Sequence, residues 1–238
     1  KILMTVVGIA GCTALMLVGF GLKDSLTDIT RKQFSSIFLY NTAAALEEGE
    51  NTQEIAKTVQ SFQELPEIDG VLPMVSENFT TVGKSRQDIT VYVPKDPQQL
   101  SQFISLHERK SKRELTLQDS GGIITEKAAK LLDVGVGDTV TIRDADNREY
   151  AIPITGITEN YASHFLYLSP EGYSSIFGKE CSYSTLLCNL SPDATEDEAA
   201  QQILKQENIL GVSSTSSLNK DFNDIIGTLN YVVLVLII

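Results

Sequence analysis

The 238-residue chain contains 31 acidic and 19 basic residues, which gives it a formal net charge of -12. A surface this acidic repels the phosphate backbone of nucleic acid, so we expect no nucleic-acid partner. The two histidines, His107 and His164, lie in different contexts without an HExxH or other metal-ligand spacing, which argues against a zinc centre or a Ser-His-Asp arrangement. We therefore expect no catalytic, cofactor-binding or metal-binding residue in this chain.

The first element is an uncharged, apolar segment from Ile2 to Leu22. As a helix it would reach roughly 31 Å, which matches the hydrocarbon core of a bilayer, so residues 1–22 are predicted to form a transmembrane helix. Bulky residues continue to the end of the segment without a small-residue cleavage site, which argues against a cleaved signal peptide. Gly8 and Gly11 are candidate helix-packing positions, although glycine is also simply common in membrane helices.

Residues 23–35 are predicted to continue outward as a stalk helix, because Leu26 and Ile29 follow Leu22 at helical spacing. The alternative is an ordinary amphipathic helix that faces a core. Leu26 and Ile29 are candidate coupling residues, since they lie where motion of the membrane helix would enter the stalk.

A second stalk is predicted at residues 218–230, where Phe222 and Ile225 share a helical face and are further candidate coupling residues. The solidly apolar residues 231–238 are interpreted as the start of a second, truncated transmembrane helix. A buried terminal strand is the alternative for those eight residues. The expected order is therefore span, large polar domain and second span.

The polar domain is predicted to have an α+β fold, with a split β-α-β subdomain of the porter-like type formed by residues 36–94 and 168–217. Its first part contains strands at 35–46, 70–79 and 88–94, and a helix that Asn51 and Glu54 cap and Pro66 ends. Its second part contains a strand at 183–190, a helix capped by Thr195 and Glu198, and a strand near 209–216.

Residues 95–167 are predicted to form an inserted, mainly β subdomain. Thr125 begins a short helix with Ala128, Leu131 and Leu132 on one side, and Gly135 is expected to end it with a positive φ. The sequence GVGD at 135–138 lies between this helix and a strand, the reverse of a strand-turn-helix nucleotide site, so it is interpreted as a turn. Two antiparallel strands at 139–144 and 149–157 follow.

Two groups of residues are candidates for surface recognition. The basic residues Arg109, Lys110, Lys112 and Arg113 could meet lipid head groups, wall polymers or an acidic partner, and a solvated loop is the alternative. Tyr161 and Phe165 could form a recognition surface, and burial in the core is the alternative.

Cys181 and Cys188 flank the segment SYSTLL. If the segment is one strand, the two cysteines lie about 23 Å apart, beyond the roughly 7 Å that a disulfide allows. A disulfide between them therefore requires a bend in the chain.

Two stretches of the sequence resemble the extracytoplasmic domain of FtsX-like (MacB-type) ABC transporter permeases. They are GGIITEKAAKLLDVGVGDTVTI at 121–142 and YAIPITGITENYASHFLYLSPEGYSSIFG at 150–178. In that family a helix of the form I-S/T-E-K-x-A-x-x-L leads into a V-G-D-x-V turn, and a G-I-x-E-N-Y strand end leads into Y-x-S-P-x-x-Y. The resemblance covers nearly the whole chain, including the order of the membrane spans.

The resemblance implies a non-catalytic permease subunit in the cell membrane, with its large domain outside the cytoplasm, as in Gram-positive bacteria. ATP would be bound by a separate cytoplasmic ABC ATPase, and the permease would work as a homodimer or with a second permease half, surrounded by membrane lipid. The outer domain would couple ATP-driven motion to the export or handling of a peptide, a lipid or a drug-like substrate. The alternatives are a two-span receptor, such as a sensor-kinase ectodomain, and a membrane-anchored enzyme, for which the sequence offers no convergent polar site.

Overall fold

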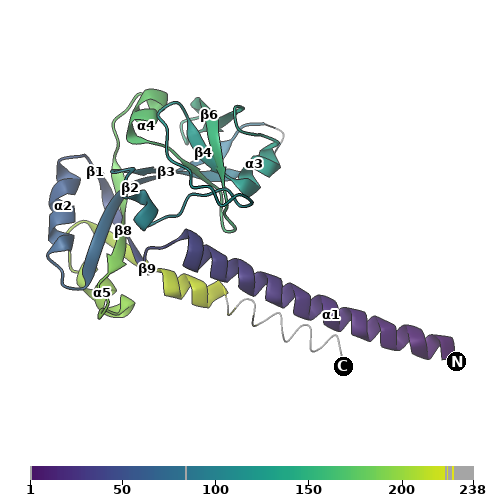
Figure 1. The fold of residues 1–238 in the computed structure, drawn as a ribbon. Coiled ribbons are helices and arrows are strands. Elements are labelled where there is room, and N and C mark those ends of the chain that lie inside the picture. Colours follow the sequence, from purple (N-terminus) through teal and green to yellow (C-terminus); the bar gives the residue numbers. More distant parts are fainter. Residues whose placement is uncertain (1, 84, 223, 225–226, 228–238) are drawn as a thin grey trace.

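A computed structural model describes residues 2–83, 85–222, 224 and 227 of the chain. Helix α1 (Ile2–Lys32) projects as one long rod from a two-part folded domain (Figure 1). The continuous helical stretch Met4–Ile37 includes a window with a mean hydropathy of 2.0 and no buried residue, so it is long and apolar enough to cross a membrane. The predicted second span, 231–238, and the candidate coupling residue Ile225 lie outside the described residues.

At its domain end the stalk continues into a π-helical turn, η1 (Gln33–Ile37). The amide of Phe38 donates to the carbonyl of Gln33 at 2.9 Å, which closes the five-residue spacing of a π turn. Ile37 and Phe38 are buried, so this stretch packs into the core as a helical turn. The prediction of a strand from residue 35 onward is therefore wrong at its start, and the strand begins only at Thr42.

The split subdomain has the predicted α+β arrangement. Its antiparallel sheet has the order β2-β8-β1-β9, and α2 and α5 add Ile55, Phe62, Ala199 and Ile203 to the same hydrophobic cluster. The bounds are β1 (Thr42–Glu50), α2 (Glu54–Gln63), β2 (Ile68–Thr81), β8 (Tyr183–Leu190), α5 (Glu196–Ile203) and β9 (Ile209–Ser214).

Both predicted capping boxes are present. The side chain of Asn51 accepts a hydrogen bond from the amide of Glu54 at 3.1 Å, and the Glu54 carboxylate accepts one from the amide of Asn51. Thr195 and Glu198 make the same reciprocal pair at the start of α5. These local signals start the two helices because they satisfy amides that otherwise have no partner within the helix.

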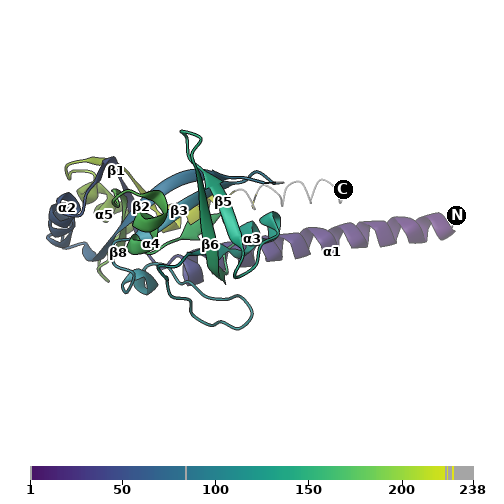
Figure 2. The same cartoon turned by 90° about the horizontal axis from the view of Figure 1, so that it is seen from above.

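The inserted part is a closed ring of six strands that shares β2 with the split sheet (Figure 2). The strand pairs are β2–β3, β3–β7, β7–β4, β4–β6, β6–β5 and β5–β2. The bounds of the remaining elements are β3 (Asp88–Pro94), η2 (Leu100–Gln102), β4 (Gly122–Thr125), α3 (Glu126–Leu132), β5 (Thr139–Arg143), β6 (Glu149–Thr158), β7 (Phe165–Tyr167) and α4 (Pro170–Phe177).

Strand β2 connects the two parts because its halves pair with different neighbours. Its first half pairs with β8 from Ile68 to Met74, and its second half pairs with β3 from Met74 to Thr80. Strand β3 also pairs with β7 of the insertion, so it belongs to the ring, whereas the sequence placed it in the split subdomain. The chain thus passes from one part to the other within one continuous strand.

Helix α3 differs from its predicted form in two details. Its buried residues are Ala128 and Ala129, while Leu131 is 42% exposed and does not share their environment. The left-handed residue that ends the helix is Asp133, with a φ of 56°, and not Gly135. The amide of Gly135 instead donates to the carboxylate of Asp138 at 2.7 Å, which fixes the turn before β5.

The two outer cysteines are free and buried. Cys188 lies inside β8 and Cys181 lies just before that strand, which runs from residue 183 to residue 190. Because β8 is extended throughout, the bend that a disulfide would need is absent from this strand.

A second hydrophobic cluster joins the base of the stalk to both parts of the domain. The stalk contributes Ile37 and Phe38, and the partly buried Phe34 packs against the cluster. The remaining members come from the split sheet, the ring and the segment after β3: Tyr40, Leu72, Met74, Leu100, Phe103, Ile104, Leu106, Ile123, Phe165, Tyr167 and Leu187. The stalk therefore ends inside the domain and is not a flexible tether on its surface.

Candidate functional site

Gln33, the first residue of the π turn, connects the stalk to the β6–β7 loop. Its side chain is only 1% exposed. Its Nε2 donates to Oδ1 of Asn160 at 2.9 Å, and its Oε1 accepts from the amides of Tyr161 at 2.9 Å and Ala162 at 3.1 Å. One buried side chain of the stalk thus makes hydrogen bonds to three consecutive residues of the loop.

Asn160 holds the same loop closed from the other side. Its Nδ2 donates to the carbonyls of Ala162 and Ser163, and Ser163 has a φ of 61°. Asn160 thus closes the loop on itself, while its side-chain oxygen and the backbone amides of Tyr161 and Ala162 bind Gln33. Removing that partner would leave buried polar groups unsatisfied, at a cost of about 1–3 kcal/mol each.

The neighbouring residue, Glu159, ties the loop to the basic segment. Its carboxylate is 5% exposed and accepts from Lys112 Nζ, from the Tyr161 hydroxyl and from His107 Nε2 at 2.8 Å. Burial would raise the pKa of this carboxyl, but the hydrogen bonds from Lys112, Tyr161 and His107 outweigh it and lower the pKa to about 2. Glu159 is therefore a buried anion with its acceptor positions occupied.

Backbone contacts add to this connection. The amide of Glu159 donates to the carbonyl of His107 at 2.8 Å, and the amide of His107 donates to the side-chain hydroxyl of Thr158 at 3.1 Å. The guanidinium of Arg109 lies 5.6 Å from the centre of the Tyr161 ring, within cation–π range. Residues 107–113 are thus held against the loop that holds Gln33.

The structure brings some of the predicted recognition residues together and separates others. Arg109, Lys112 and Tyr161 gather around Glu159, which the sequence analysis did not select. Lys110 is exposed, and Arg113 pairs with Glu108.

Phe165 is not a surface residue, contrary to the prediction, because it is 7% exposed. Its ring stacks on Tyr92 at 4.9 Å and meets the edge of Phe38 at 5.9 Å. The core alternative for this residue is correct.

The second stalk lies beside the domain end of the first stalk (Figure 1). Residues 215–222 are helical, so the helix begins three positions before the predicted residue 218. The ring of Phe222 lies 5.8 Å from that of Phe34, and the hydroxyl of Thr215 donates to the carbonyl of Tyr40. Of the other candidate residues, Leu26 is half-buried and Ile29 is 37% exposed, and no described residue lies within 4 Å of a Cβ added at Gly8 or Gly11.

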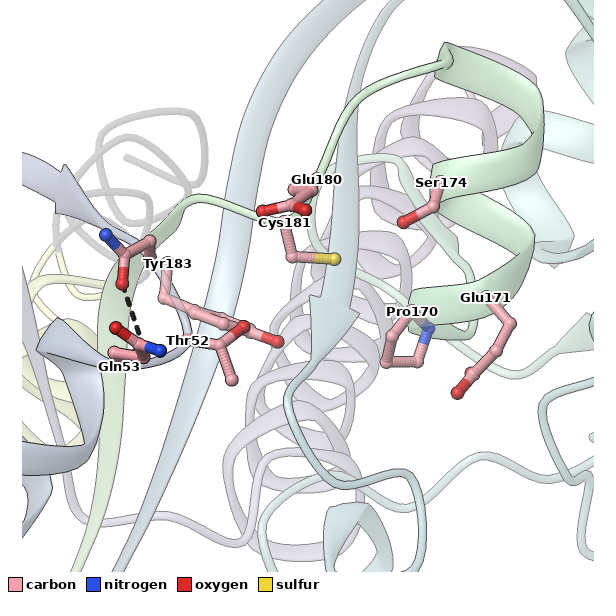
Figure 3. A pocket seen from close by; sticks show the side chains of 9 residues that line it. Thr52, Gln53, Pro170, Glu171, Ser174, Glu180, Cys181 and Tyr183 are labelled. Carbon is pink, nitrogen blue, oxygen red and sulfur yellow. Dashed lines mark hydrogen bonds between the residues drawn. The ribbon is translucent and has the colours of Figure 1, made fainter.

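A hollow of about 700 Å³ lies between the starts of α2 and α4 (Figure 3). Its lining includes the carboxylates of Glu171 and Glu180 and the buried Cys181, and burial raises the pKa of that thiol. A thiol of this kind is a poor nucleophile. Among the residues that the structure describes, no group of three His, Cys, Asp or Glu side chains could hold a metal ion.

Residues 2–206 match the family model described as the MacB-like periplasmic core domain. The chain belongs to this family. The match confirms the resemblance drawn from residues 121–142 and 150–178, and it extends over most of the chain. The E-N-Y residues of that resemblance are the ones that bind Gln33 and the basic segment in this MacB-like domain.

Two solved structures are similar in outline. The periplasmic region of MacB from Actinobacillus actinomycetemcomitans is 13% identical, with a TM-score of 0.46, over 78% of this chain and 94% of that one. The extracellular domain of the noncanonic ABC-type transporter YknZ from Gram-positive bacteria is 15% identical, with a TM-score of 0.44, over 72% of this chain and 100% of that one. No curated protein sequence matches the chain significantly.

Proposed function

We propose that this chain is a permease subunit of an ABC transporter, and that its outer domain converts motion of the membrane helices into extracytoplasmic handling of a substrate. The observation that carries the proposal is the buried side chain of Gln33, fixed at the end of α1 by three hydrogen bonds to the β6–β7 loop. Membership of the MacB-like family supports the same role.

The route of the motion follows the contacts. A helix moves as a rod, so rotation or tilt of α1 at the membrane displaces its far end at Gln33. The hydrogen bonds to Asn160 and Tyr161 pass that displacement to the loop, and Glu159 passes it to Lys112 in the basic segment. The π turn Gln33–Ile37 lies at this junction, and turns of this kind are frequent at functional sites.

ATP hydrolysis belongs to a partner in this proposal. The GVGD turn separates α3 from β5, so it lacks the strand-turn-helix order of a phosphate loop. A cytoplasmic ABC ATPase would supply the energy, and this subunit would be non-catalytic. Peptides, lipids and drug-like molecules are the substrate classes that we propose.

The assembly would contain two permease subunits or halves in the cell membrane of a Gram-positive bacterium, with the large domain outside. Gly8 and Gly11 would lie at a contact between membrane helices, because no described residue lies within 4 Å of a side chain added at either position. A two-span receptor would share the paired stalks, but membership of the MacB-like family favours the permease.

Limited proteolysis can test this function without knowledge of the substrate. The basic segment at 107–114 is rich in trypsin sites, and its position depends on Glu159. In the complete permease with its ATPase in nanodiscs, we expect the rate of cleavage in this segment to differ between the nucleotide-free and the ATP–vanadate state. Insertion of four glycines after Lys23 should abolish the difference and leave ATP hydrolysis in place.

A four-glycine insertion in the exposed 145–148 turn is the matched control, and it should preserve the nucleotide-dependent difference. The proposal is contradicted if the chain binds no ATPase, or if cleavage is the same in both nucleotide states.

A further inference from the structure

A small hollow in the ring carries two arginines in an otherwise acidic protein. It has a volume of about 190 Å³, and its described lining consists of Thr80, Thr81, Val82, Gly83, Arg86 and Arg143. No carboxylate is among these described lining residues, although the chain as a whole has a net charge of -12. The described lining is therefore basic, although Arg143 also pairs with the neighbouring Glu149.

The two guanidinium groups have hydrogen-bonding capacity left. Arg143 ends β5 and uses Nη2 to pair with Glu149 at 2.5 Å, while its buried Nε has no hydrogen-bond partner among the described residues. Arg86 is exposed and makes no ion pair within the described part of the chain. The Nε of Arg143 is covered, so the guanidinium must turn slightly to present it to a ligand.

The nearest other polar groups are already engaged. The Thr81 hydroxyl donates to the carbonyl of Ser85 and accepts from the amide of Gln87. The Thr80 hydroxyl donates to Asp88 at 3.4 Å. Among the described side chains that line the hollow, the free donors thus come from the arginines, whose forked geometry suits an oxyanion.

The size of the hollow limits the ligand. Pockets for drug-sized molecules measure about 300–1,000 Å³, so a hollow of 190 Å³ suits a single charged group. We propose that the Arg86–Arg143 hollow binds a phosphate group. This site is independent of the coupling role proposed above.

The position of the hollow indicates the source of the phosphate. It lies at the β2–β3 end of the ring, and both views place that end on the side toward which α1 extends (Figures 1 and 2). If α1 crosses the membrane, this end of the ring faces the bilayer surface. The head group of an anionic phospholipid is therefore the source that the site fits, and it would fix the ring relative to the membrane.

Calorimetric titration of the full chain in maltoside micelles with inorganic phosphate tests the site itself. We expect saturable binding that chloride does not reproduce, weakened about tenfold or more by Arg86→Gln or Arg143→Gln. Arg148→Gln is the matched control, because Arg148 is 71% exposed in the neighbouring turn, and it should leave the affinity unchanged within about twofold.

Arg86→Gln removes an exposed side chain that makes no ion pair with any described residue, so it should fold normally, which circular dichroism would verify. Equal phosphate affinity in the wild type, Arg86→Gln and Arg148→Gln would overturn the proposal, and so would the absence of saturable binding.

Hydrogen exchange in nanodiscs tests the source of the phosphate. Residues 80–83 and 85–87 should exchange more slowly in phosphatidylglycerol discs than in discs of an uncharged glycolipid without phosphate, and Arg86→Gln should remove the difference while Arg148→Gln keeps it. Phosphate binding in micelles without this lipid effect would support the site and overturn the lipid as its source. Failure of the coupling test would leave both results unaffected.

Discussion

The side-chain amide of Gln33 donates to the side-chain oxygen of Asn160 at 2.9 Å, across 127 positions of the sequence. Gln33 begins the π turn that follows the long helix, and Asn160 lies in the loop between β6 and β7. Both are buried, so the pair lies inside the domain and is shielded from water. The pair joins the helix to the closed loop beside the hydrophobic contacts of Ile37 and Phe38, and the account of coupling depends on this junction.

Gln33→Ala should destabilise the outer domain by about 2–4 kcal/mol, because it leaves Asn160 Oδ1 and two loop amides without partners. Gln201→Ala, on the exposed face of α5, is the matched control and should change the free energy of unfolding by less than about 0.5 kcal/mol. Urea unfolding of the full chain in micelles, followed by circular dichroism, measures both. Equal effects of the two substitutions would show that the hydrogen bonds to Gln33 contribute nothing to the free energy of unfolding.

The Glu159 carboxyl should make stability depend on pH in the acidic range. Its pKa in the folded protein is about 2, below the ordinary value of 4.5, so it stabilises the fold above pH 4.5 and loses this contribution as the pH falls toward 2. Glu159→Gln should therefore flatten the decline in unfolding free energy between pH 4.5 and pH 2, by an amount on the order of 2 kcal/mol. The exposed Glu64→Gln is the control and should keep the slope of the wild type.

Phe165→Ala should cost about 3–4 kcal/mol of stability, because the ring is buried between Tyr92, Phe38 and Tyr167. Leu210→Ala removes a side chain that is 69% exposed and should change stability little. Thermal unfolding of the two variants distinguishes the core position from a recognition surface. A surface residue at 165 would leave the melting temperature unchanged.

The two stalks should be coupled energetically through their phenylalanines. The rings of Phe34 and Phe222 lie 5.8 Å apart at an angle of 51°, a geometry in which aromatic pairs add about 0.5–1.5 kcal/mol beyond burial. A double-mutant cycle with Phe34→Leu and Phe222→Leu should give an interaction free energy in this range. An interaction free energy within error of zero would mean that the two stalks are not coupled through Phe34 and Phe222.

Much of the fold follows from local sequence signals. The strand at 183–190 and the capping boxes at Asn51 and Thr195 appear where the sequence predicted them, because short apolar runs and caps depend on residues within a few positions of one another. The apolar first helix is equally local, since its length and hydropathy alone define it.

The closed ring and the stalk junction could not be predicted from local sequence signals. The parallel pairing of β3 with β7 joins Tyr92 to Tyr167, and no local pattern specifies such a contact. Gln33 gives no signal at all in an isolated sequence, because its partners lie beyond residue 159. The burial of Phe165 has the same cause, since the ring and the π turn must both form before that side chain is covered.

A distance measurement between the stalk and the ring tests the central claim most directly. Nitroxide labels at the exposed Thr27 of α1 and at Asp146 in the β5–β6 turn, whose side chain is 75% exposed, would report the junction by pulsed electron resonance. The sample is the complete permease with its ATPase in nanodiscs, with labelled subunits diluted by unlabelled ones.

We predict one narrow distance distribution in the wild type, both without nucleotide and with ATP–vanadate, because stalk and ring move together. Gln33→Ala should broaden it, and the control Gln201→Ala should not. A distribution that Gln33→Ala leaves unchanged would contradict the claim that Gln33 carries the motion of the stalk into the outer domain.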